Sequence, residues 1–183
     1  VTGVFLSPAL GTSGITAGAT WKKVWSASNY EVDSVTAVTY GIGAMAWYKN
    51  ALYFGTVHWF GGAFEAHQRV YGALSRSDGD LYWQRVRGTH RAAILVRLTG
   101  VGTSKTRAEL LYGDASLWRY ATSRKGASWS LVPNGMGGAG KYGAAGVGNP
   151  WNQYAWSMAV YSEGSCSTTN GARCSGMRSV AGR

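Results

Sequence analysis

The sequence predicts an all-β fold built from four-stranded antiparallel meanders that repeat along the chain. Twenty-seven glycines against three prolines suit many tight turns between short strands better than long helices. Short apolar runs alternate with polar turns, which is typical of strands. A Trp followed three residues later by Val occurs three times, at Trp21, Trp83 and Trp129, each time after a polar turn that contains glycine. Self-similarity at this spacing indicates an array of repeated units.

The first predicted unit covers residues 35–86, after a strand candidate near the start of the chain and the first Trp copy. Its predicted strands are 35–40, 43–48, 51–56, 69–74 and 83–86. The second and third form a hairpin around Lys49 and Asn50, because asparagine tolerates the positive φ that such a turn requires. Residues 57–68 are expected to be a loop rich in aromatic and histidine side chains.

The second predicted unit covers residues 87–132, and a third begins at 153–161. The strands expected in the second unit are 92–98, 108–113, 116–121 and 129–132. The spacing from Trp83 to Trp129 lies within the roughly 40 to 50 residues expected of a four-stranded propeller blade. The pattern therefore predicts β-propeller blades within one domain.

The turn before the third Trp resembles the Asp-box of sialidase-type (BNR) β-propellers, and the repeat as a whole is also similar to kelch-like repeats. Thr122, Gly126 and Trp129 fit that motif, while Arg124 stands where the family has Asp. The resemblance implies that the Trp residues of the repeat are structural elements on the outer rim and not catalytic. Because a propeller ring needs about four blades, we expect residues 1–183 to be part of a larger ring, completed by further blades or another protein chain.

Composition bounds the classes of partner. The apolar fraction of 45% gives the chain ample surface to bury, and no apolar run is long enough to span a membrane. The net charge of +10 attracts phosphate backbones, anionic lipids or acidic glycans alike. Since the basic residues are dispersed, a solvated basic face and a specific anionic partner both stay open.

The two cysteines, Cys166 and Cys174, enclose a short polar loop. A disulfide and two free thiols are both compatible with this spacing, and the disulfide is the preferred interpretation. It predicts an oxidising compartment, so the protein is expected to be secreted or otherwise extracytoplasmic.

Loops that connect strands are the usual binding elements of propellers. The candidate ligand-binding residues are His58, Trp59, Phe60, His67, Arg87, His90 and Arg91. The first four belong to the aromatic loop and suit stacking on a sugar ring, although a loop folded onto its own domain would have the same composition. The last three lie between the units, where they either meet an acidic ligand or form a solvated connection.

Catalysis has little support in the sequence. The acidic residues are Glu31, Asp33, Glu65, Asp78, Asp80, Glu109, Asp114 and Glu163, and no two are placed as a glycosidase pair. Three histidines without ligand spacing predict no metal, and no cofactor is expected. We therefore expect a non-enzymatic scaffold or a module that binds protein or carbohydrate. The alternative is a fragment of a propeller-fold glycan hydrolase or lyase whose catalytic acids lie on missing blades; nucleic-acid binding is a weaker third option.

Overall fold

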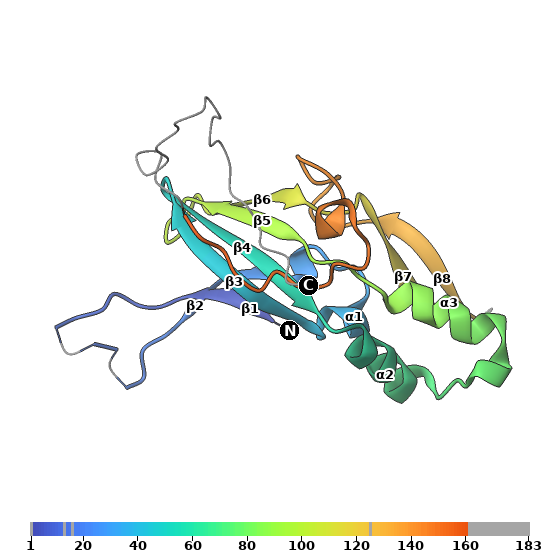
Figure 1. The fold of residues 1–183 in the computed structure, drawn as a ribbon. Coiled ribbons are helices and arrows are strands. Elements are labelled where there is room, and N and C mark those ends of the chain that lie inside the picture. The colour runs from blue at the N-terminus through green and yellow to red at the C-terminus, as the bar shows by residue number, and fades with distance from the viewer. Residues whose placement is uncertain (1, 13, 16, 125, 161–183) are drawn as a thin grey trace, which may run out of the picture.

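A computed structural model describes residues 2–12, 14–15, 17–124 and 126–160 (Figure 1). At its centre is a four-stranded antiparallel sheet in the order β3-β4-β5-β6. The strands are β3 (Tyr40–Tyr48), β4 (Ala51–His58), β5 (Leu95–Thr99) and β6 (Arg107–Tyr112). Two smaller antiparallel pairs accompany it, β1 (Gly3–Leu6) with β2 (Lys22–Ser26) and β7 (Ser116–Ser123) with β8 (Gly126–Pro133).

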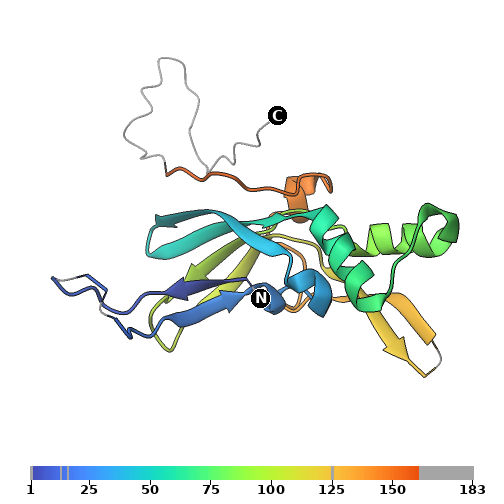
Figure 2. The ribbon, with the colours of Figure 1, turned by 90° about the horizontal axis from the view of Figure 1, so that it is seen from below.

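The β1–β2 pair covers one face of the central sheet, and the main hydrophobic core lies between them (Figure 2). Trp25 of β2 packs edge-on against Phe54 of β4, with ring centroids 4.8 Å apart. Ile94, Val96 and Leu98, on the segment that forms β5, are fully buried in the same core. Each ring or branched side chain of this size contributes roughly 1.5 to 3 kcal/mol when fully buried, so this interface is the main source of the fold's stability.

The opposite face of the sheet is crossed by the extended segment 152–158, which we call the strap (Figure 2). It is fixed to the end of β4 by hydrogen bonds from the His58 N–H to the Gln153 carbonyl (2.9 Å) and from the Ala155 N–H to the Thr56 carbonyl (3.1 Å). Gly43 and Gly55 make this approach possible, since a Cβ on either residue would collide with Ala155. The strand predicted to open the third unit at 153–161 is therefore, over its described part, an extended strap with one isolated bridge.

Two helices, α2 (Phe60–Tyr71) and α3 (Asp80–Thr89), lie with the β7–β8 hairpin at one end of the sheet (Figure 1). The remaining helical pieces are short: η1 (Ala27–Asn29), α1 (Ser34–Ala37), η2 (Arg76–Asp78) and η3 (Ala145–Gly148). We call α2, α3 and the hairpin the helical lobe. Its presence makes the protein mostly β with a helical part, so the all-β prediction holds only in part.

Several predicted elements are wrong, and each error has a local cause. The strand expected at 35–40 starts as the helical turn α1, because the Asp33 carboxylate caps it by accepting the Thr36 N–H (2.8 Å). The aromatic loop 57–68 and the strand 69–74 are instead the end of β4 followed by α2. The strand 83–86 lies within α3.

The hairpin prediction is confirmed. Lys49 and Asn50 both have positive φ, 44° and 59°, and β3 pairs with β4 directly across this turn. The strands predicted at 92–98, 108–113, 116–121 and 129–132 are also present, as β5, β6, β7 and β8, and the predicted neighbours β5–β6 and β7–β8 pair antiparallel. However, β6 pairs with β5 and not with β7, so the four-stranded meander runs from β3 to β6. It straddles the boundary between the predicted units 35–86 and 87–132.

Candidate functional site

The polar interior beside the helical lobe is organised around two buried acidic residues. Glu31 receives the Arg91 guanidinium at 2.7 Å and 3.0 Å, together with the Tyr40 hydroxyl at 3.2 Å. Arg91 also donates to the carbonyls of Gly88 and Trp118. Burial alone would lower the pKa of Arg91, but the neighbouring Glu31 raises it above its ordinary value. The guanidinium thus remains charged, and its contacts with Glu31 tie the segment before α1 to the connection between α3 and β5.

Asp33 is the second buried carboxylate. Its oxygens accept hydrogen bonds from His67 Nε2 (2.8 Å), the Thr36 N–H (2.8 Å) and the Tyr120 N–H (3.0 Å). Burial favours the neutral acid, but these three donors outweigh it and lower the pKa of Asp33 to about 2. An ionised carboxylate only accepts hydrogen bonds, so the His67 ring carries its proton on Nε2.

The outer side of His67 is closed by aromatic rings. Trp129 stacks on it with centroids 5.2 Å apart and ring planes 24° from parallel, and Tyr71 and Tyr120 complete the cover. Trp129 in turn lies against Gly88 of α3, where a Cβ would overlap its ring. His67 is fully buried, and its Nδ1 has no hydrogen-bond partner among the described residues. The Asp33–His67 pair therefore cannot meet a substrate and serves as an internal tie.

His58 is also inaccessible. It is fully buried at the end of β4, with Nε2 3.1 Å from the Thr39 hydroxyl. Burial, together with the positive charge of Arg91, lowers the pKa of His58 to about 3. The ring is consequently neutral at physiological pH.

A different set of residues forms an exposed aromatic surface on the helical lobe. Trp59, which directly precedes α2, packs its indole against the backbone of Gly61 and Gly62, where a Cβ would come within 3.1 Å and 2.5 Å of ring atoms. The indole remains 59% exposed. The two glycines therefore seat one side of the ring on the helix and leave much of it open to solvent.

A separate set of six rings, which includes Phe60, the residue after Trp59 in the chain, forms a continuous series that we call the aromatic row. Its members in order are Trp151, His90, Phe60, Phe64, Tyr82 and Trp83, with successive centroid distances of 4.8, 5.7, 6.4, 5.3 and 5.2 Å. Phe60 and Phe64 lie one turn apart on α2, so their side chains share a face of that helix. The ends of the row are the most open, with Trp151 76% and Trp83 48% exposed.

Two cationic or polar groups accompany the row. Arg87 lies one helical turn after Trp83 on α3 and is exposed. The Nε2 atom of His90 is buried without a hydrogen-bond partner among the described residues, and burial, followed by the charge of Arg91, lowers the pKa of this ring. The surface therefore combines aromatic ring faces with the polar edge of His90 and the exposed guanidinium of Arg87.

The candidate residues predicted from the sequence divide between these two regions. His58, His67 and Arg91 lie in the interior, whereas Trp59, Phe60, Arg87 and His90 lie on or beside the aromatic surface. Sequence reasoning missed Trp151, which comes from a distant glycine-rich segment. The sequence around Trp151 gives one indication of its exposure. The Gly-, Asn- and Pro-rich stretch there predicts neither a strand nor a helix against which an isolated Trp could pack.

The three Trp residues of the sequence repeat do not share one environment. Trp129 packs between α2 and α3, but Trp21 is 50% exposed and Trp83 lies at the open end of the aromatic row. The buried indole of the first copy is its neighbour Trp25. Cys166 and Cys174 lie outside the described residues, so their predicted disulfide stays a prediction.

Within the described residues, no group of three His, Cys, Asp or Glu side chains could hold a metal ion. The helices of this part of the chain are all too short or too polar to cross a membrane. Comparisons with protein-family models, curated proteins and solved structures find no match to the chain.

Proposed function

We propose that this protein is a non-enzymatic module that binds carbohydrate through the aromatic surface formed by Trp59 and the aromatic row. The observation that carries the proposal is the seating of Trp59 on Gly61 and Gly62, which fixes an indole without burying it. A pyranose ring has C–H groups on its faces and hydroxyls at its rim, so it stacks on a rigid indole and leaves its polar groups to water. A side chain that is already fixed loses little entropy when a ligand arrives.

The extent of exposed aromatic area supports a binding role. Large apolar side chains that gather on a surface mark sites of interaction, and the aromatic row joins six rings in one series, with Trp151 and Trp83 exposed at its ends. The exposed Arg87 and the net charge of +10 favour glycans that carry carboxylates or sulfates.

The internal ties explain why the surface is rigid. The Glu31–Arg91 and Asp33–His67 pairs join the segment before α1 to α2, to the start of β5 and to β7. Both carboxylates are saturated with donors and are buried, which leaves them unsuited to acid–base work on a substrate. A hydrolase or lyase role would need acids other than Glu31 and Asp33.

Binding to two soluble polysaccharides tests the proposal: polygalacturonate as the acidic probe and hydroxyethyl cellulose as the neutral one. Affinity electrophoresis should show retardation of the wild-type protein. The Trp59→Ala and Trp151→Ala variants should each bind about 5- to 150-fold more weakly, if a lost sugar-stacking contact is worth roughly 1 to 3 kcal/mol, as stacking of a nucleobase on an aromatic side chain is. Trp47→Ala is the matched control, since Trp47 is comparably exposed on β3 at a distance from α2. Equal retardation of all three variants would refute the proposal.

The wider architecture also stays a prediction. If this chain is part of a larger propeller, its native mass should exceed that of one copy, or a partner chain should co-purify with it. Intact-mass measurement with and without reductant tests the Cys166–Cys174 disulfide, which predicts a mass lower by two hydrogens in the unreduced protein.

A further inference from the structure

β6 lies at the edge of the central sheet, and only part of that edge is covered. The turn at Gly140–Gly143 caps its second half, where the Lys141 N–H donates to the Leu110 carbonyl (2.9 Å) and the Tyr142 N–H to the Leu111 carbonyl (2.8 Å). Among the described residues, no backbone hydrogen bond from outside the sheet reaches Arg107, Ala108 or Glu109. The first half of β6 is therefore an open sheet edge.

The hydrogen bonds of the covered second half of β6 show which way the unpaired backbone groups of its first half point. Because the Leu110 carbonyl points outward to Lys141, the alternation along a strand turns the N–H and C=O of Ala108 to the same outer side. Ala108 pairs with Leu98 on its inner side without using these groups for the ladder. One donor and one acceptor thus face away from the sheet at Ala108.

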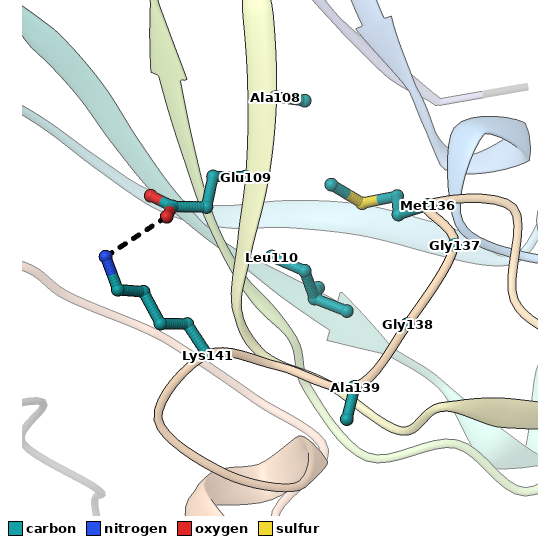
Figure 3. Close-up of a pocket in the computed structure, with 8 residues that line it drawn as sticks. All are labelled: Ala108, Glu109, Leu110, Met136, Gly137, Gly138, Ala139 and Lys141. Atoms are coloured by element: carbon teal, nitrogen blue, oxygen red, sulfur yellow. Dashed lines mark hydrogen bonds and ion pairs between the residues drawn. The ribbon is translucent and has the colours of Figure 1, made fainter.

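These groups face a groove of about 330 Å³ (Figure 3). One wall is the segment Ala108 to Leu110, and the other is the loop Met136 to Ala139. On the loop, a Cβ placed on Gly137 or Gly138 would meet no atom within 4 Å. The space beside these two glycines is therefore free of other described atoms. A groove between a sheet edge and a loop with two adjacent glycines has the shape that an extended peptide requires.

The charges along the groove define the partner further. Glu109 is neutralised by Arg97 on β5 and by Lys141, whose Nζ lies 3.3 Å from its carboxylate. Arg107 and Lys105, at the start of β6 and just before it, do not line the groove; they are exposed and form no ion pair with another described residue. The strand therefore enters the groove from a cationic stretch of chain. A second copy of this chain would bring a net charge of +10 against the same charge, which disfavours self-pairing.

We propose that the open edge of β6 binds an extended, acidic segment of a partner protein by strand addition. The segment exchanges backbone hydrogen bonds with Ala108, its alternate side chains enter the groove beside Met136, and its carboxylates face Arg107 and Lys105. This site is separate from the aromatic surface, and its occupant is a peptide.

The test uses a pool of fluorescent heptapeptides in which aspartate alternates with randomised apolar residues, and a second pool with lysine in place of aspartate. Fluorescence anisotropy should show binding of the aspartate pool to the full chain and none of the lysine pool. Ala108→Pro removes the outward N–H, a change that edge strands tolerate, and should weaken binding roughly tenfold, in line with the loss of a hydrogen bond. Ala108→Thr keeps the donor and should bind almost as the wild type.

A second pair of variants guards against a folding artefact. Gly138→Leu fills the groove from a position with open space and should abolish binding, whereas Gly11→Leu, which also enters open space but on the β1–β2 connection, should not. Unchanged thermal unfolding in all four variants shows that the fold is intact. Equal binding of wild type and Ala108→Pro, preference for the lysine pool, no binding of either pool, or dimerisation of the chain through this edge would each overturn the proposal.

Discussion

The burial of His58 makes a specific prediction about acid stability. The pKa of this ring is lowered to about 3 in the folded protein, against about 6.5 for an unperturbed histidine. The folded protein therefore stabilises the neutral form of His58 in preference to the protonated form. This preference contributes fully to the free energy of unfolding above about pH 6.5, and the contribution is lost progressively as the pH falls towards 3.

The loss of stability can be calculated from the two pKa values of His58, folded and unfolded. Between them, each pH unit lowers the free energy of unfolding by about 1.4 kcal/mol. Lowering the pH from 6.5 to 5 should therefore reduce it by about 2 kcal/mol. The variant His58→Gln retains a polar side chain for Thr39 but does not titrate. It should lose much less stability over the same range, even though it is less stable at pH 7.

Urea unfolding followed by tryptophan fluorescence, at pH 6.5 and at pH 5, measures this difference directly. With a typical denaturant dependence of 1 to 3 kcal/mol per molar urea, the wild-type midpoint should fall by about 1 M and that of His58→Gln by clearly less. If both proteins lose the same stability between these pH values, His58 is not the buried neutral group described above.

Two further predictions concern the packing of the helical lobe. Arg91→Met should destabilise the protein by about 3 to 5 kcal/mol, because it removes the partner of the buried Glu31 carboxylate. Arg87→Met, on the exposed side of α3, should change thermal stability little. If the two variants have similar melting temperatures, the ion-pair account is wrong. Gly88→Ala should lower the melting temperature, because the added Cβ would overlap the Trp129 ring. Helix propensity alone predicts the opposite, since alanine is the better helix former. A higher melting temperature in a thermal scan would show that Trp129 does not pack against Gly88.

The local signals in the sequence predicted the β-hairpin well. The Lys49-Asn50 turn between two apolar runs specifies β3 and β4 without help from the rest of the chain. The strands β6, β7 and β8 were found for the same reason. The predicted order of strands also gives the β5–β6 and β7–β8 pairs correctly. It does not give the pairing of β5 with β4, because that pairing depends on a connection of two helices that folds back beside the sheet.

The helices were missed because their signals conflict. In α2, Phe60 and Phe64 recur at helical spacing, but Gly61 and Gly62 between them are typical of loops. The glycines are there for the indole of Trp59, a tertiary requirement that no local pattern reveals. The repeat of Trp and Val likewise matched in sequence while its copies lie in a strand, a helix and a hairpin.

The aromatic surface was predicted in part. Trp59, Phe60 and His90 were selected as aromatic or titratable groups in supposed loops; Phe60 and His90 do lie together in the aromatic row, and Trp59 is exposed at the start of α2. His67 and Arg91 were selected on the same grounds, but both side chains are buried, because they bind the buried carboxylates of Asp33 and Glu31. Residue type alone does not separate a binding group from a buried ion pair; the position of the opposite charge does.

The most direct measurement is a footprint of the tryptophans by limited oxidation with N-bromosuccinimide, read by peptide mass spectrometry, with and without saturating polygalacturonate. The account predicts that bound glycan protects Trp59 and Trp151, while Trp47 and Trp156, which are exposed elsewhere, oxidise at unchanged rates. Protection of Trp47 or Trp156 alone, or equal oxidation of every exposed tryptophan in the presence of retained glycan, would contradict the assignment of the aromatic surface as the binding site.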